Sequence, residues 1–132
     1  MKIRKSAEDY LETMLILKER HGYIRSVDIA EELGVKKPSV TYTTKRLKES
    51  GHITMDENNY IALTKTGLAV AQSIYERHKL LTHLFIGLGV SEEIAREDAC
   101  KIEHDLSEET FEAIRQHFET YAPKAPVMKD GL

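Results

Sequence analysis

The chain has 132 residues, 41% hydrophobic and 31% charged, and a formal net charge of -3. This length allows one sizeable core or two small ones and excludes a large catalytic barrel, and the balanced composition excludes a disordered or collagen-like chain. The longest uncharged stretch, which begins at Leu80, is too short to span a bilayer, and no apolar segment follows the basic start, so the sequence predicts a cytoplasmic protein without a membrane partner.

The first half of the chain predicts three helices. Ser6 and Ser26 fit helix N-caps, because a serine hydroxyl can accept hydrogen bonds from free backbone N–H groups. Pro38 is favoured in the first turn of a helix, and Gly34 and Gly51 are typical of residues that end one. The predicted helices cover residues 6–21, 27–33 and 36–50.

A hairpin and three further helices follow. Two runs of strand-forming residues, 52–55 and 60–63, flank a polar cluster suited to a turn and predict a β-hairpin. Thr64 or Thr66 caps a long helix that ends near Gly87, and Ser91 and Ser107 cap helices to about residues 106 and 121. The residues predicted to face inward on the third and the long helix are Val40, Leu47, Thr43 or Thr44, Leu68, Ala71, Ile74, Leu81, Leu84 and Phe85.

This order of elements predicts the fold class and the domains. Two helices joined by a tight turn and followed by a hairpin are typical of a winged helix-turn-helix. We expect a mainly α protein, with this domain over residues 1–67, an all-helical domain over 68–121 and a flexible tail over 122–132. Residues 1–67 carry 12 basic and 10 acidic side chains, whereas residues 68–132 carry 7 and 12, so the halves suit partners of opposite charge.

The third predicted helix has a surface suited to DNA. Five basic and no acidic side chains lie between Lys36 and Lys48. Basic residues contact phosphates, whereas side chains at the amino-terminal end of a recognition helix reach base edges. A solvated basic face is the alternative, but the core pattern of residues 25–35 favours DNA binding. The predicted phosphate-contacting and base-reading residues are Lys36, Lys37, Pro38, Ser39, Thr41, Tyr42, Lys45 and Arg46.

The second half contains a group of candidate metal ligands. Cys100, Glu103 and His104 are spaced i, i+3 and i+4, so they are expected to share one face of a helix. A thiol, a carboxylate and an imidazole are ligands for a transition metal. Alternatively, the cysteine fills the core and the polar residues are solvated. Further candidates lie on the first and the long helix: Asp9, Glu12 and His78.

An enzymatic function is not expected. Cys100 as nucleophile with His104 as its base is the one catalytic arrangement that the residues offer. The sequence contains no glycine-rich phosphate loop and no clear oxyanion site, and two residues one helical turn apart are poorly placed to attack a bound substrate.

The chain resembles the metal-dependent transcriptional repressors of the diphtheria-toxin-repressor and manganese-transport-regulator family. The similar segments are residues 6–12, 28–41, 63–67, 77–81 and 98–107, and the resemblance spans residues 5–121. It implies a winged-helix domain followed by a helical domain that forms a homodimer and binds metal. It also implies that the partner is a palindromic double-stranded DNA operator, and that the bound metal acts as corepressor of metal-uptake genes.

The resemblance implies a mixed set of metal ligands. By position, the ligands of the manganese-sensing branch are matched by Asp9, Glu12, His78, Glu103 and His104, and that branch has a glutamate in place of Cys100. The cysteine instead matches the iron-sensing branch, which has a methionine in place of Asp9. Thr82 and Arg96 stand where the iron-sensing branch has a glutamate and a histidine of a second site.

The expected cofactor is therefore Fe2+ or Mn2+, and the thiol would also suit Zn2+, Co2+ or Ni2+. The chain is expected to lack the third, SH3-like domain of the iron-sensing branch. A winged-helix transcription factor whose metal site is only structural or absent is the alternative function.

Overall fold

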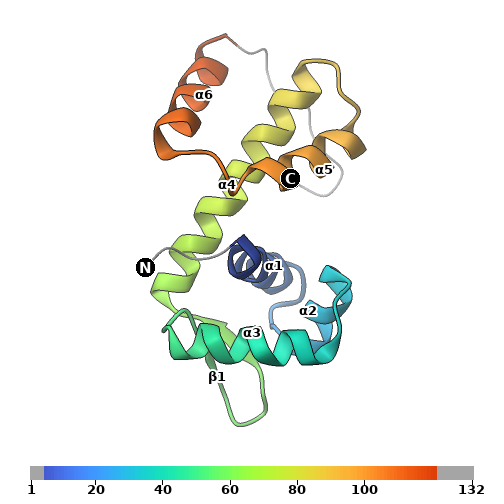
Figure 1. Cartoon of the computed structure of the whole chain (residues 1–132), viewed down its shortest axis with the longest axis vertical. Helices are drawn as coiled ribbons and strands as arrows, with labels where there is room; N and C mark the ends of the chain where they lie inside the picture. The colour runs from blue at the N-terminus through green and yellow to red at the C-terminus, as the bar shows by residue number, and fades with distance from the viewer. Residues whose placement is uncertain (1–4, 122–132) are drawn as a thin grey trace. The chain divides into compact units, whose positions relative to one another are not determined.

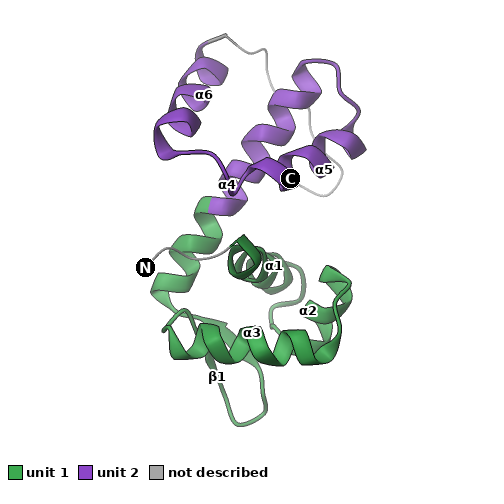
Figure 2. Ribbon diagram, viewed as in Figure 1, with its two compact units in different colours: residues 1–73 green, residues 74–132 purple. Residues whose placement is uncertain are grey.

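In the computed structural model, the described residues 5–121 form six helices and a two-stranded antiparallel sheet (Figure 1). The chain divides into two compact units, residues 1–73 and 74–132 (Figure 2). Within residues 5–121, no helix is long and apolar enough to cross a membrane. The predicted tail, 122–132, lies outside the described residues. The elements are α1 (Lys5–His21), α2 (Ser26–Leu33), α3 (Lys37–Glu49), β1 (Ile53–Met55), β2 (Ile61–Leu63), α4 (Lys65–Gly87), α5 (Glu92–Ile102) and α6 (Glu108–Tyr121).

The first unit contains the helix-turn-helix. Helix α2 packs against both α1 and α3, and α3 also contacts β1. Gly34 ends α2 in the left-handed conformation, with φ 66°, which allows the tight turn into α3. Thr44, and not Thr43, is the buried threonine of α3. The apolar core of this unit includes Leu11, Met14, Leu17, Ile29, Val40, Leu47 and Ile53.

The predicted hairpin is confirmed. Its strands pair antiparallel, with Ile53 opposite Leu63. The Asp56 carboxylate accepts hydrogen bonds from the backbone N–H groups of Asn58 and Tyr60, both at 2.9 Å, which holds the turn. The exposed turn therefore presents the acidic side chains of Asp56 and Glu57.

Two of the predicted N-caps are wrong. Lys5, the first described residue, is already helical, so Ser6 lies inside α1. Helix α2 begins at Ser26 itself, and its N-cap residue is Arg25. Arg25 is held in an extended conformation because it pairs with Tyr60 beside the hairpin, so the helix begins directly after it. A tertiary contact thus sets this helix start.

The other predicted caps agree with the structure. Thr64, and not Thr66, caps α4, because its hydroxyl accepts a hydrogen bond from the Gly67 N–H at 3.1 Å. The Ser91 hydroxyl accepts from the N–H of residue 94 at 3.4 Å, and the Ser107 hydroxyl accepts from that of residue 110 at 3.1 Å. These serines fix the starts of α5 and α6.

The second unit consists of the rest of α4 together with α5 and α6. Its buried apolar residues include Ile74, Leu81, Ala95, Ala99 and Phe111, whereas Leu84 and Phe85 are half-buried. Helix α5 ends at Ile102, which is exposed, and residues 103–105 form a turn. The prediction that this helix continues to about Leu106 is therefore wrong.

Candidate functional site

The outer face of α3 carries the side chains expected to contact DNA. Val40, Thr44 and Leu47 point into the core of the first unit, so the other side of the helix faces solvent. All eight predicted DNA-contacting residues are exposed: Lys36, Lys37, Pro38, Ser39, Thr41, Tyr42, Lys45 and Arg46. Their positive charges and hydroxyl groups are suited to phosphates and base edges.

Tyr42 and Arg46 form a pair on this face. The Tyr42 side chain is one of the exposed large hydrophobic groups of the chain, at 63% exposure. The Arg46 Nη1 atom donates to the Tyr42 hydroxyl at 3.3 Å, and the guanidinium carbon lies 5.6 Å from the ring centroid. The pair thus presents an aromatic ring and a cation one helical turn apart, which is suited to a base edge with an adjacent phosphate.

Glu103 is the centre of a polar cluster in the second unit. Its side chain is 0% exposed, and His78 Nδ1 lies 2.9 Å from its Oε2 atom. His104 Nε2 lies 3.4 Å from Oε1, but without hydrogen-bond geometry, so the buried Oε1 atom accepts no hydrogen bond. Burial by itself raises the pKa of Glu103, but the interactions with His104 and His78 outweigh it and hold this pKa below its ordinary value. The cluster is built around a buried carboxylate.

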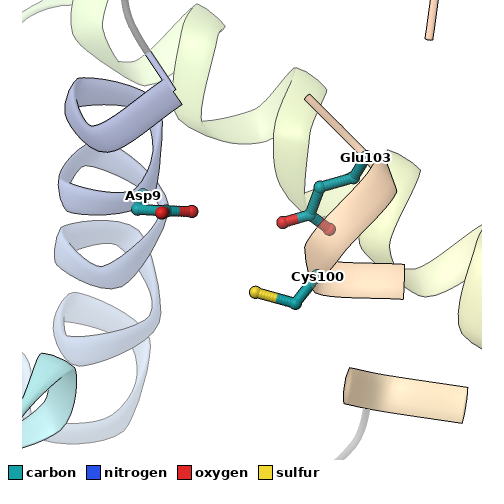
Figure 3. Close-up of side chains that lie close together, drawn as sticks. All are labelled: Asp9, Cys100 and Glu103. Atoms are coloured by element: carbon teal, nitrogen blue, oxygen red, sulfur yellow. The ribbon is translucent and has the colours of Figure 1, made fainter. Parts of the chain in front are cut away.

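Cys100 adds a thiol to this cluster. Its Sγ atom and a carboxylate oxygen of Glu103 lie within 4.8 Å of each other. Figure 3 draws both side chains at the end of α5, and it also draws Asp9, which comes from α1 of the first unit. A thiolate beside a carboxylate is stabilised by a cation that both can bind.

The expected single helical face for Cys100, Glu103 and His104 needs a correction. Helix α5 ends at Ile102, so Glu103 and His104 lie just after it. Glu103 still has helical dihedral angles, φ -58° and ψ -29°, and its N–H donates to the Ala99 carbonyl at 3.0 Å. It therefore stays on the side of Cys100, while His104 reaches the carboxylate from the following turn.

Residues of α4 support the cluster. The fully buried Thr82 hydroxyl donates to the His78 carbonyl at 2.7 Å, so a structural role accounts for this threonine. Arg77, which the sequence analysis did not single out for a function, donates to the backbone carbonyl of Glu103 at 3.0 Å. Its position directly before the candidate ligand His78, on a helix whose inward residues are mostly apolar, could have indicated a role for Arg77.

The two remaining predicted ligands lie in the first unit. Asp9 and Glu12 are three residues apart on α1, which places both carboxylates on one helical face. Asp9 is half-buried and Glu12 is buried. The other four predicted ligands lie together in the second unit: His78, Cys100, Glu103 and His104.

The donor set of the second unit fits a divalent transition-metal ion. Imidazole, thiolate and carboxylate are ligands of Zn2+, Fe2+ and related ions. The buried Glu103 Oε1 atom, which accepts no hydrogen bond, is the type of atom that a cation would satisfy. The residues present therefore fit such an ion.

Two family models match nearly the whole chain. One, described as "Iron dependent repressor, N-terminal DNA binding domain", matches residues 2–59. The other, described as "Iron dependent repressor, metal binding and dimerisation domain", matches residues 64–122. The first contains the exposed face of α3, and the second contains the Glu103 cluster.

Comparison with individual proteins also finds similarity to transcriptional regulators. The chain is 40% identical over 121 residues, 92% of this chain and 78% of the relative, to "Transcriptional regulator MntR" of Escherichia coli O6:H1. It is 34% identical, over 91% of this chain and 98% of the relative, to an uncharacterized HTH-type transcriptional regulator of Methanocaldococcus jannaschii. The solved "manganese regulator SloR" is similar with a TM-score of 0.77 and 29% identity, over all of this chain but only 62% of that one.

Proposed function

The chain belongs to the iron-dependent repressor family of metal-dependent, DNA-binding transcriptional regulators, and we propose from this premise that Fe2+ or Mn2+ activates it to repress metal-uptake genes in the cytoplasm. The observation that carries the proposal is the buried Glu103 carboxylate with imidazoles on both sides, in the part matched by the metal-binding domain. Members of such a family are regulators rather than enzymes. The match to a metal-binding and dimerisation domain does not favour a metal-free winged-helix factor.

The proposed ligands come from both units. The acidic face of α1 offers two carboxylates, and the cluster around Glu103 offers a third carboxylate, two imidazoles and a thiol. A bound ion would supply the positive charge that such a set lacks. The mixed donors suit Fe2+ and Mn2+, and the thiol also accepts Zn2+, Co2+ or Ni2+. The six proposed ligands are Asp9, Glu12, His78, Cys100, Glu103 and His104.

Electrostatics explains how these residues would form a switch. In the proposed site without metal, the carboxylates of Asp9 and Glu12 would repel that of Glu103, which would make association of α1 with the second-unit ligands unfavourable. Neutralising the carboxylates removes this repulsion and fixes α1, and with it the DNA-binding unit. Metal and DNA are then coupled ligands, each of which raises the affinity for the other.

We propose that α3 is the recognition helix and that two copies of the chain bind one operator. The dimerisation domain supports a homodimer. A two-fold dimer presents two recognition helices that fit half-sites about 34 Å apart, one turn of DNA. The operator is accordingly expected to be palindromic.

The switch is tested by comparing DNA binding with and without metal. A duplex selected from a random pool in the presence of Mn2+ serves as the probe, and its affinity is measured by fluorescence anisotropy with Mn2+, Fe2+, Zn2+ or EDTA. We expect Mn2+ or Fe2+ to tighten binding about tenfold or more, a coupling free energy of about 1.4 kcal/mol or more. Equal affinity in all four conditions would contradict a metal-activated repressor.

A second test addresses the reading role of Tyr42. In the variant Tyr42→Ala, binding to the selected duplex is expected to lose about 1–3 kcal/mol of free energy. Binding to an unrelated duplex is expected to lose much less. Tyr23→Ala, which removes an exposed tyrosine of the same unit outside α3 and the hairpin, is the matched control and should leave both affinities unchanged. Equal losses for both duplexes would assign Tyr42 to phosphate positioning instead.

A further inference from the structure

Arg77 is a buried arginine with four contacts inside the second unit. Its side chain is 8% exposed. Nη1 donates to the backbone carbonyls of Glu103 at 3.0 Å and Leu106 at 2.6 Å, and Nη2 lies 3.0 Å from a carboxylate oxygen of Glu108. The guanidinium carbon lies 5.0 Å from the centroid of the Phe111 ring. One side chain of α4 therefore holds the turn after α5 and the first turns of α6.

The end of α5 differs from the ends of the preceding helices. A glycine with positive φ follows each of α1, α2, α3 and α4 within two residues, namely Gly22, Gly34, Gly51 and Gly89. Such a residue normally allows the last carbonyls of a helix to be satisfied. Within the described residues, none with positive φ follows α5. The carbonyls of Ala99 and Ile102 instead accept from the N–H groups of Glu103 and Asp105 in the following turn. The guanidinium of Arg77, from a distant helix, donates to the carbonyls of Glu103 and Leu106 in the segment after α5.

Two neighbouring residues of α4 hold Glu103, one by its backbone and one by its side chain. Arg77 binds the backbone carbonyl of Glu103, and His78 contacts its carboxylate at 2.9 Å. A carboxyl at the end of a helix without a glycine cap would otherwise move with the fraying backbone. Arg77 thus determines where the carboxylate lies relative to the imidazole.

The ion pair with Glu108 does not explain why the Arg77 side chain is buried. The Glu108 carboxylate that pairs with Arg77 is 85% exposed, and ion pairs with exposed partners contribute little free energy. Hydrogen bonds from a charged donor to buried carbonyl groups contribute more, because those carbonyls would otherwise lose their solvation without replacement. The buried bond to the Glu103 carbonyl is therefore the most important contact of Arg77, and the half-buried bond to the Leu106 carbonyl adds to it.

We propose that Arg77 is a positioning residue of the metal site, which holds the Glu103 carboxylate in the geometry for metal binding without being a ligand itself. The proposal rests on the proposed function, because it assumes that the Glu103 cluster binds a divalent ion. Groups that orient metal ligands through hydrogen bonds typically change metal affinity by about 10- to 100-fold when they are removed.

The test compares Arg77→Met with Arg115→Met. Arg115 also lies over the Phe111 ring, at 5.2 Å, and pairs with Glu76 and Glu112, whereas in the described part of the chain residues 103–106 are not among its partners. Isothermal titration calorimetry with Mn2+ is expected to give a dissociation constant about 10- to 100-fold higher for Arg77→Met and an unchanged constant for Arg115→Met. A change below twofold for Arg77→Met would overturn the proposal.

An NMR measurement and a second variant separate a positioning role of Arg77 from a general loss of stability and from failure of the proposed function. The imidazole nitrogen NMR signals of His78, recorded in EDTA at one fixed pH, should move in Arg77→Met and stay in place in Arg115→Met, which requires no metal. If Arg77→Met does not fold, Arg77→Lys takes its place, with a smaller loss expected because its ammonium reaches fewer carbonyls. Unchanged His78 signals and Mn2+ affinity in either folded variant would overturn the role of Arg77, whereas no Mn2+ binding by the unmodified chain would overturn the metal site itself.

Discussion

Replacing Glu103 with glutamine is expected to shift the metal dependence of DNA binding to much higher Mn2+ concentrations. The substitution keeps the size of the side chain but removes the negative charge that lies between His78 and His104. It also removes a carboxylate oxygen within 4.8 Å of the Cys100 thiol. If Glu103 is a ligand as proposed, loss of its charge should raise the Mn2+ concentration for half-maximal DNA binding about 100-fold or more, which corresponds to about 3 kcal/mol.

The measurement is a Mn2+ titration of the selected duplex, followed by fluorescence anisotropy. Glu97→Gln is the matched control, because it makes the same change at an exposed position of α5, and its titration should match that of the unmodified chain. Weak binding to an unrelated duplex in EDTA should be equal in all three proteins, since α3 is not altered. If Glu103→Gln responds to Mn2+ like the unmodified chain, Glu103 is not a ligand.

Replacing Gly67 with alanine is expected to destabilise the first unit severely. Gly67 lies in the first turn of α4 against the backbone that leads into β1, and an added Cβ atom would overlap the His52 carbonyl oxygen and lie 2.9 Å from its carbonyl carbon. That oxygen accepts a hydrogen bond from the Thr64 N–H at 3.1 Å, so the backbone cannot move without breaking this bond. The expected loss is about 3 kcal/mol or more of the free energy of unfolding.

The matched control is Gly87→Ala in the same helix. Gly87 has ordinary helical geometry, and an added Cβ atom would meet nothing within 4 Å. Its substitution should leave stability unchanged or raise it by up to about 1 kcal/mol, because alanine is the better helix former. Urea unfolding followed by circular dichroism measures both variants in EDTA. Equal midpoints for the two variants would show that the backbone at His52 can adapt.

The sequence predicted the elements that depend on local pattern. Apolar spacing placed the helices, and polar residues between two strand-forming runs placed the hairpin, because these signals act within a few residues. Gly34 and Gly51 marked their helix ends correctly, since left-handed backbone favours glycine.

The errors came from contacts between residues distant in the sequence. The bridge to Tyr60 holds Arg25 in an extended conformation and so places the start of α2 one residue early. The Arg77 guanidinium donates to the carbonyls of Glu103 and Leu106, in the segment that follows the shorter α5. Neither contact has a local signature.

The metal cluster shows the same division. The spacing of Cys100 and Glu103 predicted that a thiol and a carboxylate share one side of the chain, and local helical geometry is sufficient for this. The 2.9 Å contact between His78 and Glu103 joins residues 25 positions apart, so it follows only from the packing of the second unit. The residue pattern already named His78 on the long helix as a ligand candidate, but its meeting with Glu103 depended on how the helices pack.

The unusual end of α5 has a consequence for the order of folding. The ends of α1, α2, α3 and α4 are encoded by glycines next to them and can form as soon as each helix does. The turn after α5 gains its side-chain partner only when Arg77, 26 residues earlier in the chain, packs against it, and this non-local contact requires loop closure, which costs entropy. If the Glu103 cluster binds metal as proposed, we expect a nascent chain to gain its full affinity for the ion only when the second unit has packed.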